Sequence, residues 1–183
     1  TDGAGLVRDI THNLGFSLAG KHILLLGAGG AARGVIQPLL AGQPASLFIA
    51  NRSADKAKTL ANHFADLAIP QGDFLRGAVN AGSFAETAGL SFDLIINATS
   101  ASLAGERIPL PDGIFAANCL AYDMMYGKGL TPFLLQAQAQ GAGQLADGLG
   151  MLAEQAAEAF TLWRQVRPDT APVLAALRAQ LAT

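Results

Sequence analysis

A glycine-rich turn between two apolar segments constrains this chain more than any other feature of its sequence. The turn reads Gly27-Ala28-Gly29-Gly30-Ala31-Ala32 and follows a short apolar run at His22–Leu26. An almost wholly apolar run of this length is typical of a strand that is covered on both faces. The residues from about Ala31 to Leu40 have the spacing of a helix. Strand, turn and helix together match G-x-G-x-x-A, the pattern of a dinucleotide-binding turn.

Each small residue of this turn has a physical reason. Gly27 can make the tight turn, Gly29 lets the backbone approach a pyrophosphate, and Ala32 allows close packing of the helix on the strand. The helix N-terminus offers unpaired N–H groups and a partial positive charge to the phosphates. A glycine turn without a ligand is the alternative, and the flanking strand and helix favour binding. Arg33 either adds a charge beside the phosphates or is a solvated helix residue. The residues expected to line the nucleotide here are Gly27, Ala28, Gly29, Gly30 and Ala31.

Strands and helices alternate along the chain, which predicts a Rossmann-like, doubly wound parallel sheet with helices on both faces. Strands are expected at His22–Leu26, Ser46 to Ala50, Leu67 to Ile69, Asp93 to Ala98 and Ala117 to Asp123. Helices are expected at 3–15, about Ala31 to Leu40, about Ala54 to Phe64, Leu130 to Gln140, 149–164 and 171–182. Residues 70–91 are rich in Gly, Ala and Ser and have no clear pattern. We expect a nucleotide-binding domain at 1–147, followed by C-terminal helices at 148–183.

The end of the second predicted strand indicates which dinucleotide binds. NAD enzymes carry an acidic residue about 20 positions after the glycine turn, where it accepts a hydrogen bond from the ribose 2′-hydroxyl. Here the strand ends in Asn51-Arg52-Ser53, with Lys56 one turn later. Arg52 offers a planar fork for phosphate oxygens, Asn51 and Ser53 add neutral donors, and Lys56 adds a second charge. Asn51 and Ser53 can also turn the chain and cap a helix, which is compatible with binding. The pattern predicts NADP rather than NAD, and Asp55 is expected to point away.

Composition excludes several other classes of protein. The formal net charge is -2 and there is no basic run, which argues against nucleic acid as a partner. No apolar run reaches the roughly 18 residues that span a bilayer, and no signal peptide is recognised, so a cytoplasmic location is expected. Cys119 is the single cysteine and is expected to be an inert core thiol. The three histidines have no metal-ligand spacing, so no metal is expected. Glu154 and Glu158 are expected on a solvated helix face.

Four segments together resemble shikimate dehydrogenase, and the glycine turn alone would not distinguish this family. The segment from Tyr122 to Gln155 is the most specific, because it contains Tyr122-Asp123-Met124-Met125-Tyr126 and Asp147-Gly148-Leu149-Gly150-Met151-Leu152. The other segments are Thr1-Asp2-Gly3, Gly27 to Arg33 with Asn51 to Lys56, and Asn97-Ala98-Thr99-Ser100. The resemblance implies NADPH-dependent, reversible reduction of 3-dehydroshikimate to shikimate, in the pathway to aromatic amino acids.

The resemblance also implies roles for particular residues. Asp2 matches the aspartate that pairs with a catalytic lysine, and a lysine–aspartate pair can supply the proton that the reduced ketone needs. Without the resemblance, Asp2 would be interpreted as a helix N-cap. Tyr126 and Gln155 match residues that contact the substrate. The positions implied near the cofactor are Ala98, Thr99 and Ser100 in the loop after a central strand, and Met124, Gly148 and Met151 near the nicotinamide.

The chain departs from the family pattern at its beginning. It opens at Thr1-Asp2-Gly3 without an initiator Met, so we expect a fragment or a processed form. In the family the catalytic lysine lies upstream, in the substrate domain, and Lys21, Lys56, Lys58 and Lys128 do not match it. We therefore expect negligible shikimate oxidation by this chain alone. Ala101-Ser102 also stands where many relatives carry a glycine.

The C-terminal helices carry two apolar stripes at helical spacing. One stripe consists of Leu149, Leu152, Ala156, Phe160 and Trp163, and the other of Val173, Leu174, Leu177 and Leu181. In the family this part of the chain returns to the substrate domain, and residues 1–15 are expected to act as a hinge helix. The stripes must pack on each other, on the sheet domain or on another chain. We predict self-association through residues 149–182.

Two other functions remain open from the sequence. A quinate/shikimate dehydrogenase would tolerate an added hydroxyl on the substrate and could prefer NAD, against which Asn51-Arg52-Ser53 argues. A nucleotide-sensing module without catalysis could use the same fold. The presence of Asp2, Tyr126 and Gln155 together argues against such a sensor, because a sensor need not keep residues that face a substrate.

Overall fold

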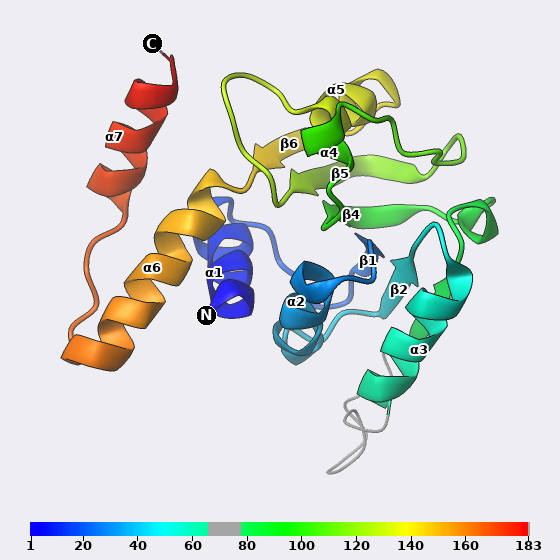
Figure 1. Ribbon diagram of the computed structural model, residues 1–183, viewed down its shortest axis with the longest axis horizontal. Helices are drawn as coiled ribbons and strands as arrows, with labels where there is room; N and C mark the ends of the chain where they lie inside the picture. The colour runs from blue at the N-terminus through cyan, green and yellow to red at the C-terminus, as the bar shows by residue number, and fades with distance from the viewer. Residues whose placement is uncertain (66–77, 183) are drawn as a thin grey trace.

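The computed structural model describes residues 1–65 and 78–182, which form a six-stranded parallel sheet between two layers of helices (Figure 1). The strand order is β3-β2-β1-β4-β5-β6. The strands are β1 (His22–Leu26), β2 (Ser46–Ala50), β3 (Ala78–Gly82), β4 (Phe92–Asn97), β5 (Phe115–Asp123) and β6 (Gln144–Asp147). The direction of the strand order reverses between β1 and β4, as in the doubly wound folds that bind dinucleotides. The predicted fold class is confirmed.

The main helices lie close to where the sequence periodicity predicts them. They are α1 (Asp2–Arg8), α2 (Gly30–Ala41), α3 (Ala54–Ala65), α5 (Pro132–Ala139), α6 (Leu149–Arg164) and α7 (Ala171–Ala182). Shorter pieces are the π-helical η1 (Asp9–Asn13), the 3-10 turn η2 (Ala85–Thr87) and α4 (Ala101–Ala104). Gly15 follows η1 with a φ of 65°, which suits its predicted role in stopping the first helix.

Two strands lie where the sequence shows no strand pattern. β3 consists of small residues and pairs in parallel with β2, from Ser46 opposite Ala78 to Ala50 opposite Gly82. β6 has four residues and pairs with β5 at the edge of the sheet. Both are short and weakly apolar, so pairing with a neighbouring strand specifies them more than composition does. The strand predicted at Leu67 to Ile69 lies outside the described residues.

Alternate side chains of the central strands enter two separate apolar cores. Ile23 and Leu25 of β1 point to the face that α1, α2, α3 and α6 cover. Leu24 and Leu26 point to the opposite face, where Phe133 and Leu134 of α5 pack. The side chains from Ile23 to Leu26 are all buried, which explains why the sequence of this strand is a continuous apolar run after His22.

Helix α1 lies between α2 and α6, and glycines allow both contacts (Figure 1). A Cβ on Gly3 would lie 2.5 Å from the Gly34 carbonyl oxygen of α2. A Cβ on Gly5 would lie 2.7 Å from the Gln155 Cβ of α6. We refer to the contact of Gly5, Arg8, Asp9 and Asn13 with Gly150, Glu154 and Gln155 as the α1–α6 seam.

The prediction that Glu154 lies on a solvated helix face is wrong. Its side chain is 0% exposed, because this side of α6 packs on α1 rather than facing water. Glu158, one turn later, is partly exposed. The predicted apolar stripe of α6 instead begins buried at Leu149 and ends exposed at Trp163.

Helix α7 has no buried residue and is held to the sheet domain by an ion pair. The Arg178 guanidinium donates two hydrogen bonds, of 2.6 and 2.8 Å, to the carboxylate of Asp147 at the end of β6. In residues 1–65 and 78–182, no helix combines the length and the apolar character needed to cross a lipid bilayer.

Candidate functional site

A cleft of about 550 Å³ opens at the carboxyl ends of β1 and β4, where the strand order reverses. The chain leaves these two strands in different directions, and this divergence creates a crevice in doubly wound sheets. Backbone hydrogen bonds hold the rim: the Gly27 N–H donates to the Ala50 oxygen at 2.7 Å, and the Ala98 N–H donates to the Leu26 oxygen at 2.9 Å. The cleft is therefore fixed by three adjacent strands.

Ten predicted site residues from three distant segments line this cleft. They are Gly27, Ala28, Gly29, Gly30, Ala31, Asn51, Arg52, Ala98, Thr99 and Ser100. The remaining lining residues are Phe84, Ala101, Glu106, Arg107, Ile108 and Pro109. Sequence reasoning missed this second group because the segment from 105 to 109 has neither a motif nor a periodic pattern. The available signal was the charged pair Glu106-Arg107, in a loop between Gly105 and Pro109, and this signal is weak.

The glycine turn is shaped as an open cradle for an anionic group. Gly27 has a φ of 108°, a conformation that residues with a side chain rarely adopt. A Cβ at this position would also lie 3.1 Å from the Ala98 carbonyl oxygen. Beyond the neighbouring residues of the chain and the backbone of α2 itself, no heavy atom of the described residues lies within 4 Å of the place where a Cβ would stand on Gly29 or Gly30. Helix α2 begins at Gly30 without an acidic residue in its first turn. Its first N–H groups and its positive dipole end therefore face the cleft without a carboxylate from the helix itself.

The residues after β2 place Asn51 and one cation, Arg52, at the rim of the cleft, and a second cation, Lys56, close by. The Asn51 Nδ2 donates a 3.1 Å hydrogen bond to the Ser53 carbonyl oxygen, which fixes the turn into α3. Arg52 and Lys56 are exposed, and neither has a hydrogen bond or an ion pair within the described residues. Cations that the protein leaves unpaired are available to an anionic ligand.

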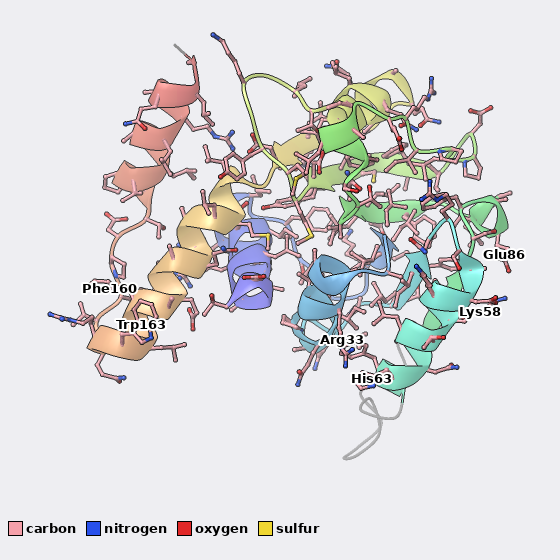
Figure 2. The ribbon with its side chains drawn as sticks, viewed as in Figure 1. Arg33, Lys58, His63, Glu86, Phe160 and Trp163 are labelled. Carbon is pink, nitrogen blue, oxygen red and sulfur yellow. The ribbon has the colours of Figure 1, made fainter. Side chains whose placement is uncertain are left out.

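Lys56 lines a second hollow, of about 540 Å³, on the other side of the glycine turn. Asp55 lines this second hollow and not the cleft that Arg52 lines. Arg33 and His63 stand at this hollow and point toward one another from α2 and α3 (Figure 2). The Arg33 Nη2 lies 3.1 Å from the His63 Nε2, and because a guanidinium can only donate, the imidazole nitrogen accepts.

Buried polar side chains hold the loop after β4 in the cleft wall. The Thr99 N–H and hydroxyl both donate to the Asn97 Oδ1, at 3.0 and 2.7 Å. The Asn97 Nδ2 in turn donates to the Asp123 Oδ1 at 3.1 Å. Asn97 and Asp123 are fully buried, and buried polar groups with this many partners rigidify their surroundings.

Asp123 accepts three further hydrogen bonds. The hydroxyls of Ser102 and Thr131 donate to its Oδ2 at 2.6 and 2.5 Å, and the Met125 N–H donates to its Oδ1 at 3.0 Å. Sequence reasoning gave Asp123 no role of its own. The signal was a polar residue that ends a strongly apolar strand, directly beside Asn97 in the neighbouring strand.

The residues expected near the nicotinamide lie beside the cleft, at the ends of β5 and β6. The Met124 N–H donates to the Asn97 oxygen at 3.0 Å, which brings Met124 next to the loop that lines the cleft. A Cβ on Gly148 would overlap the Met124 carbonyl oxygen, so a larger residue cannot stand there without a shift of the backbone. Met151 is buried in the core below.

The three residues expected at the substrate lie on separate elements, and none of them lines the cleft. Asp2 is exposed in the first turn of α1, where Thr1 rather than Asp2 is the N-cap. Tyr126 follows β5 and is 45% exposed. Gln155 lies half-buried on α6 against Gly5.

The single cysteine behaves as predicted. Cys119 is fully buried in β5, and burial raises the pKa of its thiol to about 12. A thiol of this kind stays protonated and unreactive at neutral pH. Among the residues that the structure describes, no group of three or more His, Cys, Asp or Glu side chains is placed to hold a metal ion.

Comparison with known sequences gives two family matches. A family model described as Shikimate / quinate 5-dehydrogenase matches residues 8–104, more than half of the chain. A second, described as Shikimate 5'-dehydrogenase C-terminal domain, matches residues 148–178. The shikimate dehydrogenase (NADP(+)) of Dechloromonas aromatica is 72% identical over 181 residues, which cover 99% of this chain and 63% of that protein. The chain thus spans less than two thirds of this relative.

Solved structures resemble the whole described chain. An Ael1 enzyme from Pseudomonas putida matches with a TM-score of 0.83 and 48% identity, over 100% of this chain and 62% of that one. A shikimate 5-dehydrogenase from Thermus thermophilus, solved in complex with NADP(H) and shikimate, matches with a TM-score of 0.78 and 30% identity. That match covers 98% of this chain and 62% of the Thermus chain.

Proposed function

The chain belongs to the shikimate/quinate 5-dehydrogenase family, and from this premise we propose that it supplies the NADP-binding part of an NADP-dependent shikimate dehydrogenase. The reaction is the reversible reduction of 3-dehydroshikimate to shikimate, a step toward the aromatic amino acids. The curated relatives support this function over a quinate-accepting enzyme or a nucleotide sensor, because they are named shikimate dehydrogenase (NADP(+)).

One observation carries the choice of cofactor: the cleft at the ends of β1 and β4 joins an open glycine cradle to Arg52, which has no partner within the described residues. The end of β2 carries no acidic residue. The cradle and the N-terminus of α2 would hold the pyrophosphate. Arg52 would hold the 2′-phosphate, with Asn51, Ser53 and Lys56 beside it. The loop from Ala98 to Ser100 and the segments of Met124 and Gly148 would border the nicotinamide end. When bound, NADP(H) supplies or accepts the hydride of the reaction.

The remaining roles concern the substrate. Asp2 would pair with a lysine outside this sequence and help to hold the proton that passes to the substrate oxygen. Tyr126 and Gln155 would contact the substrate. We propose that residues 1–147 bind the nucleotide, that residues 1–15 form a hinge, and that 148–183 contact the substrate domain. This chain alone is expected to have negligible turnover.

The cofactor proposal is tested by titrating the chain with NADP+ and NAD+ in a calorimeter. We expect tighter binding of NADP+, and Arg52→Ala should remove the preference by weakening NADP+ at least roughly tenfold. Lys58→Ala is the matched control, because Lys58 is a cation of α3 that lines neither hollow. Equal affinities for the two nucleotides in the unaltered chain would contradict the assignment of Arg52.

We also propose self-association through residues 149–182. Large apolar side chains are exposed on this part of the molecule, with Trp163 80% exposed beside Phe160 at the end of α6 (Figure 2). Such a patch favours burial against another surface. Sedimentation should detect dimers that Trp163→Glu abolishes, and a monomer at high concentration would contradict the proposal.

A cytoplasmic location is a further proposal, supported by the free thiol of Cys119.

A further inference from the structure

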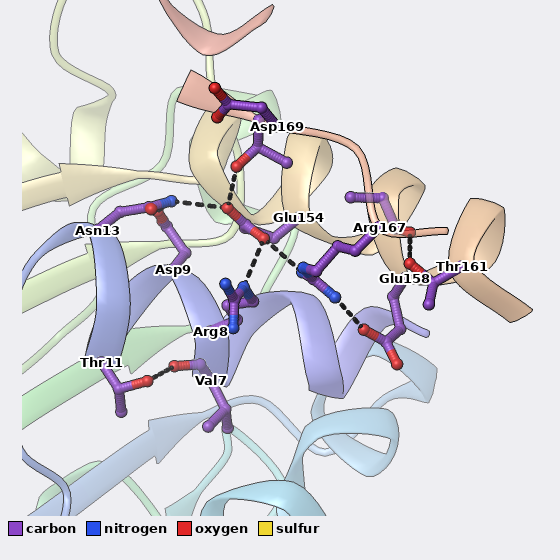
Figure 3. A network of polar contacts seen from close by, with 12 residues as sticks. Val7, Arg8, Asp9, Thr11, Asn13, Glu154, Glu158, Thr161, Arg167 and Asp169 are labelled. Atoms are coloured by element: carbon purple, nitrogen blue, oxygen red, sulfur yellow. Dashed lines mark hydrogen bonds and ion pairs between the residues drawn. The ribbon is translucent and has the colours of Figure 1, made fainter. Parts of the chain in front are cut away.

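The carboxylate of Glu154 connects three segments of the molecule although no water reaches it (Figure 3). From the first helical segment, the Arg8 Nε lies 3.1 Å from its Oε2 and the Asn13 Nδ2 donates to its Oε1 at 3.2 Å. From the connection between α6 and α7, the Arg167 Nη2 donates at 2.8 Å and the Thr170 hydroxyl donates at 2.6 Å. Both oxygens are therefore satisfied from outside the helix that carries them.

At the centre of the α1–α6 seam, a glycine lets the two helices approach closely. Gly5 of α1 faces the backbone and Cβ of Gln155 at this point. A glycine surface allows close approach, but it does not oppose rotation or sliding of one helix on the other. Directional contacts have to fix the register. Glu154 supplies one, the hydrogen bond from Asn13, and adds an ion pair with Arg8, whose Nε lies close to the carboxylate but makes no hydrogen bond.

A second contact fixes the far end of the seam. The carboxylate of Asp9 accepts a 2.7 Å hydrogen bond from the Tyr122 hydroxyl and a 2.9 Å bond from the Asn13 Nδ2. A Cβ on Gly150 would overlap this carboxylate. Asn13 bridges Asp9 and Glu154, so the two contacts form one network along the seam.

The seam joins the elements that carry two proposed substrate residues. Asp2 lies at the start of α1, and Gln155 directly follows Glu154 on α6. We propose that Glu154 is a positioning residue, which together with Arg8 sets the register of α1 on α6 and thereby the placement of Asp2 relative to Gln155. This inference rests on the proposed function. Neither Glu154 nor Arg8 needs to touch substrate or cofactor for it to hold.

The charges around Glu154 agree with a permanent contact at neutral pH. Burial acts to raise its pKa, but hydrogen bonds from Thr170, Asn13 and Arg167 and the charge of Arg8 outweigh burial, so the pKa lies below its ordinary value. Arg167 also donates to Glu158 at 2.7 Å, and this second carboxylate balances its charge. Among the described residues, no hydrogen bond or ion pair joins Glu158 to α1, which makes it a control on the same helix.

The test uses the complete enzyme that contains this chain, with Glu154→Gln, Arg8→Gln, the double variant and Glu158→Gln. Glu154→Gln and Arg8→Gln should each raise the KM for shikimate roughly tenfold, because small displacements of substrate-facing groups are costly. The double variant should raise the KM no further than Glu154→Gln alone, since the Arg8 contact is already lost in that variant. The Kd for NADP+, measured by calorimetry, should stay unchanged in all variants, and Glu158→Gln should keep the unaltered KM.

The outcomes separate this inference from the proposed function. If the unaltered enzyme does not oxidise shikimate with NADP+, the proposed function fails and the inference fails with it. If the unaltered enzyme is active and Glu154→Gln lowers the thermal midpoint but not the KM, Glu154 is only structural and the inference is overturned. Should Glu154→Gln not fold, Arg8→Gln decides alone, because the Arg8 side chain is 40% exposed and its loss leaves the core intact.

Discussion

Both the cleft and the α1–α6 seam contain cationic side chains and glycines. The two regions differ in whether the protein itself supplies the groups that contact these residues. Arg52 and Lys56 are exposed and have no partner within the described residues. At the seam, Arg8 and Arg167 both contact Glu154. A buried carboxylate without partners would cost several kcal/mol. Pairing at the seam therefore fixes helices, whereas Arg52 in the cleft and Lys56 in the neighbouring hollow keep their charge for a ligand.

The glycines of the two regions differ in the same way. Gly29 has open space where a Cβ would stand, and Gly150 has the Asp9 carboxylate there. An open glycine leaves room for a phosphate, and an enclosed glycine allows two segments to touch. Equivalent substitutions should therefore have different consequences in the two regions.

The largest expected effect is on stability, at the seam. Gly150→Ala should lower the free energy of unfolding by about 3 kcal/mol, because the new methyl group displaces Asp9 from its partners. Urea denaturation measures this loss. Gly29→Ala is the contrasting variant: its stability should change by less than about 0.5 kcal/mol, while its affinity for NADP+ should fall in calorimetry. A Gly150→Ala protein as stable as the unaltered one would show that the seam is not close-packed.

The pH dependence of stability sharpens the contrast. Glu154→Gln should cost about 2 kcal/mol near neutral pH, because charge-assisted hydrogen bonds are lost. The folded pKa of Glu154 lies below its ordinary value of 4.5, so its carboxylate stabilises the fold above that value. The stabilisation is lost as the pH falls through the lower, folded pKa. The difference between variant and unaltered protein should therefore be constant at neutral pH and shrink in acid.

Denaturation curves at about pH 7, 5 and 3 measure this difference. Glu158→Gln, on the partly exposed neighbouring carboxylate, serves as the control and should have the smaller effect at every pH. A Glu154→Gln deficit that stays the same in acid would argue that shape, not charge, holds the seam.

A smaller effect is expected in the cleft, at a residue that the sequence did not single out. Arg107→Gln should weaken NADP+ and NAD+ alike, by about fivefold, because Arg107 lines the cleft of the glycine turn and would act on phosphates that both nucleotides share. Arg164→Gln, on the exposed end of α6, controls for the loss of one charge. Loss of NADP+ affinity alone would instead assign Arg107 to the 2′-phosphate.

The smallest expected effect concerns a pair that belongs to neither region. Lys58 and Glu86 form an exposed ion pair with 3.9 Å between Nζ and Oε1 (Figure 2). Exposed pairs of this kind contribute little because water screens them. Lys58→Gln should leave the thermal midpoint unchanged at moderate salt. A measurable drop in the thermal midpoint would mean that an ion pair of this protein stabilises the fold even when it is exposed to water.

Much of the fold could be predicted from short-range patterns. β1, α2 and β2 have apolar runs or helical spacing next to clear turn residues, and the structure agrees with them to within a residue or so. β3 and β6 were missed because small or polar residues become strands only beside a partner strand. Short elements at the edges of a sheet carry the least information of their own.

Part of the candidate site could be predicted for a similar reason. Gly27 to Ala31, Asn51 and Arg52 each follow a strand, and the carboxyl ends of adjacent parallel strands meet at one edge. The place of Arg107 could not be predicted, because its loop reaches the cleft by a path that no local pattern describes. The second hollow, which Lys56 and Asp55 line, could not be predicted from the sequence either.

The sequence by itself determined the glycine cradle and the absence of an acid after β2, because each depends on a few consecutive residues. It also determined the fold class, because the alternation of strands and helices is built from patterns that are each local. Only the tertiary structure decided that Glu154 is buried and paired rather than solvated. Its partners Arg8 and Asn13 lie more than 140 positions away, and helical spacing gives the face of a residue but not what covers that face. The contact surface of a helix depends on the whole packed chain, whereas the strand and its turn depend on their neighbours.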